Sequence, residues 1–290
     1  MQLISLLLSL ILAVMPGIPI LAPMKDAIHE YGVSRQAREM ITEEQLAEVA
    51  LAMEELQAES GMLDFFPLTL LDDQWQALSV AYTYACFYSV YDGLSAAEAL
   101  RIQFGVAGRS TVISMILYDL SVEPMKYDAN QHFTWGFNSA KNVGLEKSRI
   151  HQNNYELAVF FMYPSVAFIK ERYTDFLGEG QGEWEARWNA WLEGGAFGLN
   201  LREIVLEECR DIEGFNRYYS DDEIMDLWNN EKGRQAGLNT GLVGGIAFLE
   251  FRKAWDSGEL IENYEPGTVT AEQREYIFEN THLWNPTAKP

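Results

Sequence analysis

Cysteine, histidine and basic residues are all scarce in this sequence of 290 residues. Its two cysteines, Cys86 in an aromatic run and Cys209 in an acidic segment, predict buried free thiols, or one disulfide if the chain leaves the cytoplasm. Lysine and arginine number 21 against 43 acidic residues, which leaves a formal charge of −22. Because this charge repels phosphate backbones and anionic lipids, the composition argues against nucleic-acid binding.

Common catalytic motifs are absent as well. The sequence contains no Gly-x-Ser-x-Gly elbow, no Cys-x-x-Cys pair and no His-Glu-x-x-His helix. Alternation of apolar and polar residues is scarce, and no two-residue glycine turn joins a pair of strands. Apolar residues recur at helical spacing instead, as in residues 43–59, 155–170 and 238–255. The sequence therefore predicts an all-α fold, an irregular multi-helix globular domain with an N-terminal apolar helix.

The central helix and several helix starts can be placed more closely. Residues 74–91 are apolar almost all round, so we expect this helix in the middle of the core. We expect at least about eight helices around a core that contains Tyr82, Phe87, Val90 and Phe160. Capping boxes, in which a Ser or Thr precedes a Glu or Gln by three positions, predict further helix starts. They pair Thr42 with Gln45, Ser95 with Glu98, Ser220 with Glu223, and Thr270 with Gln273.

The N-terminus carries no charged side chain from Leu3 to Met24. Residues 3–15 read as a Leu/Ile helix that prolines interrupt from Pro16 onward, whereas a straight membrane span needs roughly 20 helical residues. Three interpretations stay open: a cleaved signal peptide, a retained membrane anchor, or an apolar tail buried against a partner. The first two predict a membrane-associated or extracytoplasmic protein that contacts the membrane through residues 3–24.

The chain divides into four expected segments. Residues 1–24 form the signal peptide or membrane anchor, and residues 25–62 form an amphipathic helical segment. Residues 63–255 form the main α-helical domain, in which the glycines of residues 178–182 predict a flexible connection. Residues 256–290 form a linker and a capped C-terminal helix.

The first candidate site segment reads Asp-Ala-Asn-Gln-His-Phe-Thr-Trp over residues 128–135. On a helix, Asp128, His132 and Trp135 fall at i, i+4 and i+7, so they share one face. The carboxylate can then accept a hydrogen bond from the imidazole, an arrangement that serves as a general base or as a pair of metal ligands. We therefore predict that Asp128 and His132 are catalytic, with Trp135 beside them. A divalent metal is compatible with this pair as a cofactor, and its identity stays open.

The second segment, residues 225–234, repeats this geometry. One stripe of its expected helix carries Asp226, then Asn229 or Asn230, and then Gly233 or Arg234. Asp226 joins the predicted catalytic group, whereas the two asparagines and Arg234 are predicted to bind a ligand or to form a structural network. Gly233 is small enough to let another backbone approach closely.

The two segments are expected to meet in space, because polar groups in apolar surroundings need partners. We predict that His132 lies within hydrogen-bond reach of Asp128 or of residues 226–230. A purely architectural network is the alternative. In that network Asp128 fixes His132, Asp226 pairs with Arg234, and the asparagines tie down a loop.

At these positions the chain resembles an uncharacterised family of mostly bacterial domains, often found at the C-terminal ends of polymorphic toxins and rearrangement-hotspot repeat proteins. In that family a helix reading Asp-Ala-x-Arg-His-x-Tyr-Trp precedes a Gly, a His-Glu pair, and Met-Asp-x-x-Asn-Asn-x-x-Gly-Arg. The matching residues are Asp128, Ala129, His132, Trp135, Gly144, Met225, Asp226, Asn229, Asn230, Gly233 and Arg234. This resemblance covers roughly the middle third of the chain and implies a toxin-related effector or hydrolase.

Three departures from the family pattern bear on the chemistry. Gln131 replaces the family's Arg, Thr134 replaces its Tyr, and Tyr155-Glu156 stands in place of its His-Glu pair. Loss of that histidine removes a natural metal ligand, so the resemblance implies an altered or inactive centre. Glu156 is then the expected further catalytic residue, and Tyr155 belongs to the predicted ligand-binding or structural network.

Tryptophans mark one more helix. Trp184, Trp188 and Trp191 fall at i, i+4 and i+7, where a role in the core is expected and a sugar-stacking or membrane-interface stripe is the alternative.

Three functions stay open for the whole chain. The first is an exported or membrane-anchored protein with a His/Asp/Asn site that acts as a hydrolase or effector. The second is a non-enzymatic interaction or structural subunit of a membrane-associated assembly, with a protein partner. The third is a periplasmic glycan-binding or glycan-cleaving protein, which an exposed tryptophan groove would favour.

Overall fold

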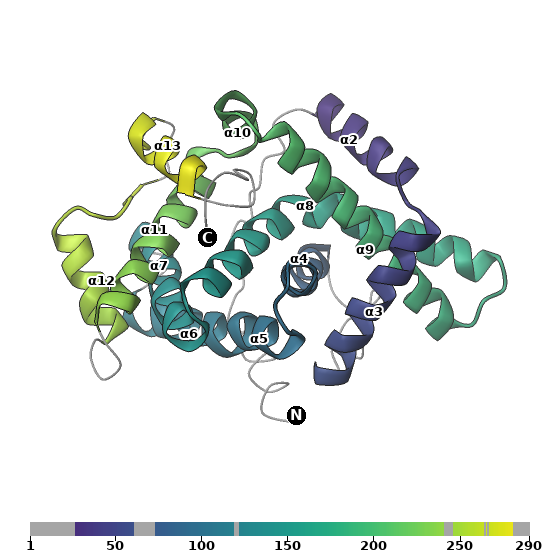
Figure 1. Ribbon diagram of the computed structural model, residues 1–290, viewed down its shortest axis with the longest axis horizontal. Coiled ribbons are helices and arrows are strands. Elements are labelled where there is room, and N and C mark those ends of the chain that lie inside the picture. Colours follow the sequence, from purple (N-terminus) through teal and green to yellow (C-terminus); the bar gives the residue numbers. More distant parts are fainter. Residues whose placement is uncertain are drawn as a thin grey trace. The chain divides into compact units, whose positions relative to one another are not determined.

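The computed structural model describes residues 27–60, 73–118, 122–240, 246–263, 265 and 267–280. These residues form helices α2 to α13 and one π-helical segment, and they contain no strand (Figure 1). The predicted all-α fold is therefore confirmed, and so is the expectation of at least about eight helices. Residues 1–24, to which the signal-peptide or anchor prediction applies, lie outside the described residues. No helix in the part of the chain that the structure describes is long and apolar enough to span a membrane.

The described residues fall into two compact units. Unit 1 takes residues 101–153 and 208–280, and unit 2 takes residues 27–100 and 154–207. Both units draw on residues 63–255, the range that the sequence analysis treats as one domain.

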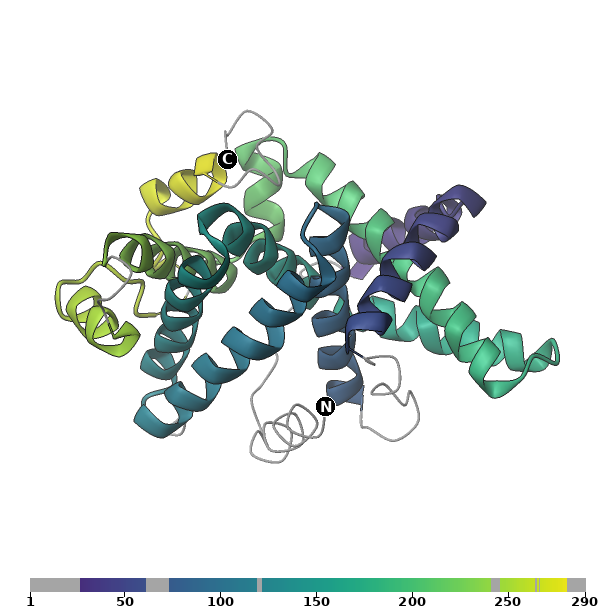
Figure 2. The same ribbon diagram turned by 60° about the horizontal axis from the view of Figure 1, so that its bottom comes forward.

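Unit 1 holds both candidate site segments. Its elements are η2 (Arg101–Ala107, π-helical), α6 (Gly108–Leu117), α7 (Pro124–Val143), the first turns of α8 (Leu145–Gly178), α10 (Ile212–Tyr218), α11 (Asp221–Asn239), α12 (Ala247–Asp256) and α13 (Ala271–Asn280). Helices α7 and α11 pack along each other and carry the two segments (Figures 1 and 2). Helix α7 starts with Pro124 in its first turn and ends at Gly144, whose φ of 89° suits glycine.

Glycines bring α7 and α11 into close contact. A methyl group on Gly136 of α7 would overlap the carbonyl oxygen of Asn230, and one on Gly233 of α11 would overlap that of Phe133. At Gly237 the same added carbon would lie 2.6 Å from the carbonyl oxygen of Phe137. The close backbone approach predicted at Gly233 is therefore confirmed, and it sets the two site segments against each other.

An aromatic core holds α7 from its other side. Phe133 of α7 packs against Phe251 of α12 with ring centroids 5.8 Å apart, and Tyr118 contacts Phe251 at 5.9 Å. Phe133 is next in sequence to His132, so this packing fixes the helix face that carries the histidine.

Unit 2 surrounds α4 (Asp73–Tyr91) with α2 (Ala27–Glu39), α3 (Glu43–Ser60), α5 (Ala96–Leu100), the rest of α8 and α9 (Glu183–Glu208). Phe87 is fully buried here, as predicted. Tyr82, Val90 and Phe160 are only half-buried, so the prediction that these three side chains lie in the core is met only in part. Tyr82 and Val90 lie two turns apart on one flank of α4, a flank that solvent partly reaches.

The predicted capping boxes form. Both reciprocal hydrogen bonds are present at Ser95 with Glu98, Ser220 with Glu223, and Thr270 with Gln273. At the fourth box the amide of Gln45 donates to Thr42 Oγ1 at 3.2 Å. The Gln45 side chain bonds Asn200 of α9 at 2.6 Å, because tertiary packing offers it a buried partner.

Candidate functional site

Helices α7 and α11 bring Asp128, His132 and Asp226 together. His132 Nε2 lies 3.2 Å from Asp226 Oδ1 and 3.7 Å from Asp128 Oδ1. One potential ligand atom from each residue falls within 4.8 Å of the others. The prediction that His132 lies within hydrogen-bond reach of the second segment is confirmed, although about a hundred positions separate the two segments in sequence.

Solvent reaches this cluster from one side. The side chain of Asp128 is 32% exposed, that of Asp226 is 17% exposed, and that of His132 is 8% exposed. The carboxylate of Asp128 is therefore partly open to water, while the imidazole is buried. A sealed core would bury all three, so this gradient suits a site that a small ligand can enter.

Burial shifts the ionisation of the cluster. It lowers the pKa of His132 below its ordinary value, against the opposing charge of Asp128 and a hydrogen bond with Asn230. Burial also raises the pKa of Asp128, against His132 and a hydrogen bond with Asp226. Burial thus favours the uncharged form of both groups, the neutral imidazole of His132 and the protonated carboxyl of Asp128.

A third acidic residue, Asp222, belongs to the same surroundings. Burial, together with the charges of Asp128 and Glu223, raises the pKa of Asp222 to about 7. Sequence reasoning missed Asp222, although its position one helical turn before Asp226 places both on one face of α11. That i, i+4 spacing was the signal that could have found it.

The Asp222→Asn substitution should make unfolding stability less dependent on pH. Between the unfolded value near 3.8 and the folded value near 7, the folded carboxyl keeps a proton that the unfolded chain has released. Its contribution to stability is thus present at low pH and lost as the pH rises through about 7. Chemical denaturation should show the variant about 2 kcal/mol more stable than the wild type at pH 8 and equally stable near pH 4. A constant difference across this range would contradict the assignment.

Trp135 lies between two histidines. Its ring centroid is 6.3 Å from that of His132 and 6.2 Å from that of His151, against which it packs edge-on. His151 Nε2 donates to Gln103 Oε1 at 3.0 Å, and burial lowers the pKa of His151 to about 3. Gln103 comes from the π-helical segment η2, a kind of turn that is frequent at functional sites. Sequence reasoning missed both residues, although His151 is one of only four histidines.

The two adjacent asparagines of α11 have different partners. Asn229 clamps the backbone of Ile261, since its Nδ2 donates to the Ile261 carbonyl and its Oδ1 accepts from the Ile261 amide, each at 3.1 Å. Asn230 faces His132 and acts to raise the pKa of its imidazole. The expectation that asparagines tie down a loop is thus met at Asn229, whereas Asn230 belongs to the cluster.

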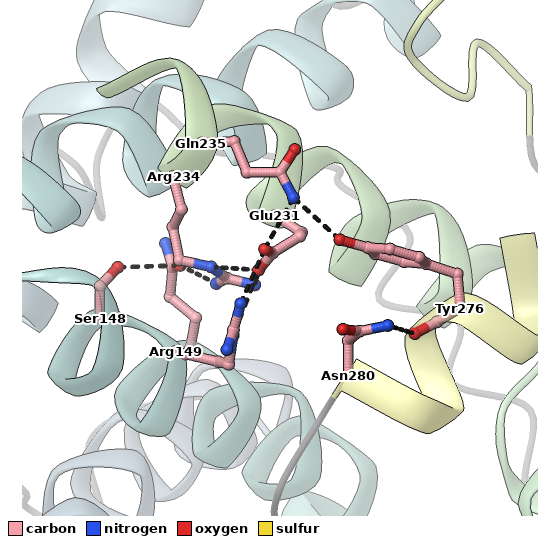
Figure 3. Close-up of polar contacts among 8 residues, drawn as sticks. Ser148, Arg149, Glu231, Arg234, Gln235, Tyr276 and Asn280 are labelled. Atoms are coloured by element: carbon pink, nitrogen blue, oxygen red, sulfur yellow. Dashed lines mark hydrogen bonds and ion pairs between the residues drawn. The ribbon is translucent and has the colours of Figure 1, made fainter. Parts of the chain in front are cut away.

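Arg234 pairs with Glu231 and belongs to a separate network, shown in Figure 3. Glu231 accepts from Arg234 Nε at 2.9 Å and from Arg149 Nη2 at 2.8 Å, and Arg234 also donates to Gln152. The two arginines hold the pKa of Glu231 below its ordinary value although burial opposes this. The predicted architectural pairing of Arg234 with Asp226 is therefore wrong, because Arg234 pairs with Glu231.

This network extends to the C-terminal helix. Gln235 donates to Glu231 at 3.0 Å and to the hydroxyl of Tyr276 in α13 at 2.9 Å (Figure 3). Glu231 accepts from both arginines and from Gln235, which is the behaviour of an architectural network. The polar residues of α11 therefore form two separate groups. Asp222, Asp226 and Asn230 belong to the His132 cluster, whereas Glu231, Arg234 and Gln235 bond residues of α8 and α13.

Tyr155 and Glu156 belong to unit 2. The Tyr155 ring contacts that of Tyr82 with centroids 5.9 Å apart, and Glu156 is 6% exposed. The predicted roles of Tyr155 and Glu156 stay predictions. In unit 1, the neighbouring pair His151 and Gln152 contacts the motif residues Trp135 and Arg234 instead.

Comparison with known proteins assigns the chain to no family. No protein-family model matches the chain, and neither a curated protein nor a solved structure does. The resemblance to polymorphic-toxin-associated domains stays a prediction from the motif residues alone.

Proposed function

We propose that the chain is a divalent-metal-dependent hydrolase whose metal ligands are Asp128, His132 and Asp226. The proposal rests on three potential ligand atoms that lie within 4.8 Å of one another. They come from two helices that pack closely through glycines. Convergent ligands on rigid elements favour a metal because they need little rearrangement to bind it.

The donor set points to particular metals. One imidazole nitrogen and two carboxylate oxygens suit zinc or manganese better than calcium, which prefers oxygen ligands alone. The lowered pKa of His132 keeps its imidazole neutral, which is the form that binds a metal. Asn230 lies beside His132, where it can orient a metal-binding histidine.

The same residues provide the chemistry of hydrolysis. A metal ion lowers the pKa of a bound water to about 7, so that hydroxide forms at neutral pH. Asp222, with its pKa near 7, can accept that proton and return it to the leaving group. With a metal ion held by Asp128, His132 and Asp226, such a water would hydrolyse an acyl or phosphoryl substrate, consuming one water and releasing two products. The partly exposed side of the cluster, at Asp128, is where a substrate can enter.

Calorimetric titration of the chelator-treated full chain with Zn²⁺ and Mn²⁺, at about pH 8, tests the proposal. We expect one bound ion per chain. Asp226→Asn and His132→Ala should each weaken binding by at least about 100-fold, because loss of an orienting residue alone costs about 10- to 100-fold. Asn230→Ala should fall within that smaller range. Hydrolysis of p-nitrophenyl acetate and bis(p-nitrophenyl) phosphate should require the metal.

The control is Asp256→Asn, the same change on an exposed residue at the end of α12. This variant should bind the metal as the wild type does. The proposal fails if Asp226→Asn also binds like the wild type. Absence of metal binding, together with a stability loss of about 1 to 3 kcal/mol in His132→Ala, would favour the non-enzymatic interaction subunit.

A further inference from the structure

A pair of tryptophans lies at the start of α9 in unit 2, independent of the proposed metal centre. Trp184 is 65% exposed and Trp188 is half-buried, whereas Trp191 is 1% exposed. The predicted role in the core is thus right for Trp191 and wrong for Trp184. The reason is that α9 begins before the region that other helices cover, so its first turn faces water.

The rings of Trp184 and Trp188, called the tryptophan pair below, lie parallel. Their centroids are 6.0 Å apart and their planes differ by 5°. Because Trp184 is largely exposed while it stacks on Trp188, one aromatic face is open to a ligand. A largely exposed tryptophan stacked on a second ring offers a flat aromatic surface, and tryptophan is enriched among the residues that dominate binding interfaces.

The chain holds this helix end in a defined position. The connection between α8 and α9 is a tight turn in which Gly180, at φ 89°, donates to the carbonyl of Leu177 at 3.0 Å. Gln181 closes the turn by donating its amide to Phe176 at 3.1 Å. Its side chain also accepts from Asn189 at 3.0 Å, which ties the turn to α9. A connection is therefore present at residues 178–182, while its predicted flexibility stays a prediction. The hydrogen bond from Asn189 joins it to the start of α9, which carries the tryptophan pair.

Acidic residues flank the tryptophan pair in sequence. Glu183 and Glu185 lie in the first turn of α9 and Glu179 lies in the preceding turn, and all three are exposed. Arg187 is the only basic residue between Glu179 and Trp191, and it is half-buried. This charge repels anionic lipid, and a neutral sugar would gain little from it. An aromatic face within a negative field suits a cation, above all the planar guanidinium of arginine.

We propose that the tryptophan pair and Glu183 and Glu185 bind an arginine- or lysine-rich segment of a partner protein. A guanidinium stacks on the open face of Trp184, and the carboxylates pair with the neighbouring basic side chains of the same segment. Tryptophan and arginine are the residue types that most often dominate such contacts. The surplus of acidic residues over the whole chain, 43 against 21 basic residues, speeds the encounter.

Fluorescence anisotropy with a labelled hexa-arginine peptide tests this proposal on the full chain at about 0.15 M salt, where long-range attraction is screened. Trp184→Ala should weaken binding about tenfold, since cation–π contacts of this kind contribute up to about a tenfold factor or slightly more. The double variant Glu183→Gln, Glu185→Gln should weaken it severalfold. Trp184→Tyr, which keeps an aromatic face, should restore most of the affinity.

The matched control is the double variant Glu43→Gln, Glu44→Gln, which removes the same charge from the first turn of another exposed helix start. It should bind the peptide as the wild type does. Equal weakening by both double variants, or undiminished binding by Trp184→Ala, would overturn the proposal. It would also be overturned if cellohexaose or phosphatidylcholine vesicles, rather than the peptide, bound in a manner that depends on Trp184.

Discussion

Replacing Glu231 with alanine should lower the free energy of unfolding by about 3 to 5 kcal/mol, the usual cost of removing one partner from a buried ion pair. Glu231 stands between Arg149 and Arg234, whose side chains are 13% and 3% exposed. Without the carboxylate, two positive charges would remain close together with little water to solvate them. Urea denaturation monitored by circular dichroism measures the loss.

A matched substitution in an exposed ion pair distinguishes the effect of burial on stability from the effect of losing an ion pair. Glu39 pairs with Arg35 at 3.0 Å, but both side chains are more than half exposed. Glu39→Ala should therefore cost less than about 1 kcal/mol. If Glu231→Ala cost no more than Glu39→Ala, the buried network would not be the structural anchor that its contacts indicate. Metal binding at His132 should survive in Glu231→Ala under conditions where the protein is folded, because the two networks use different side chains.

The Gly233→Ala substitution should destabilise the protein by about 3 kcal/mol, at the upper end of the range for overpacking. The added methyl group would overlap the backbone oxygen of Phe133, and backbone cannot move aside as a flexible side chain can. Helices α7 and α11 must then separate, which also moves Asp226 away from His132. Thermal denaturation measures the stability, and titration with Zn²⁺ should show weaker binding in the folded variant.

Gly32 provides the control for this change. It lies within α2, and an added methyl group there would meet no other atom within 4 Å. Gly32→Ala should therefore stabilise the protein by up to about 1 kcal/mol, because alanine favours the helix. A gain in stability from Gly233→Ala would show that α7 and α11 do not meet through this glycine.

Local features of the fold could be read from the sequence. Helical periodicity gave the fold class, and the capping boxes at Ser95, Ser220 and Thr270 form as predicted, because caps depend on residues only three positions apart. The pairing of Asp128 with His132 follows from helical spacing in the same way.

Partners distant in sequence were decided by tertiary structure. Arg234 is three positions from Glu231 and eight from Asp226, so spacing on α11 favours Glu231, but only the packing of α8 brings Arg149 and Gln152 to this pair. The exposure of a side chain also depends on residues distant in sequence. The three tryptophans of α9 recur at regular helical spacing, but only Trp191 is fully buried. The sequence by itself determined which faces each helix offers, because those depend on residues within a few turns. Only the packing of one helix on another decided which face is buried and which charge meets which partner.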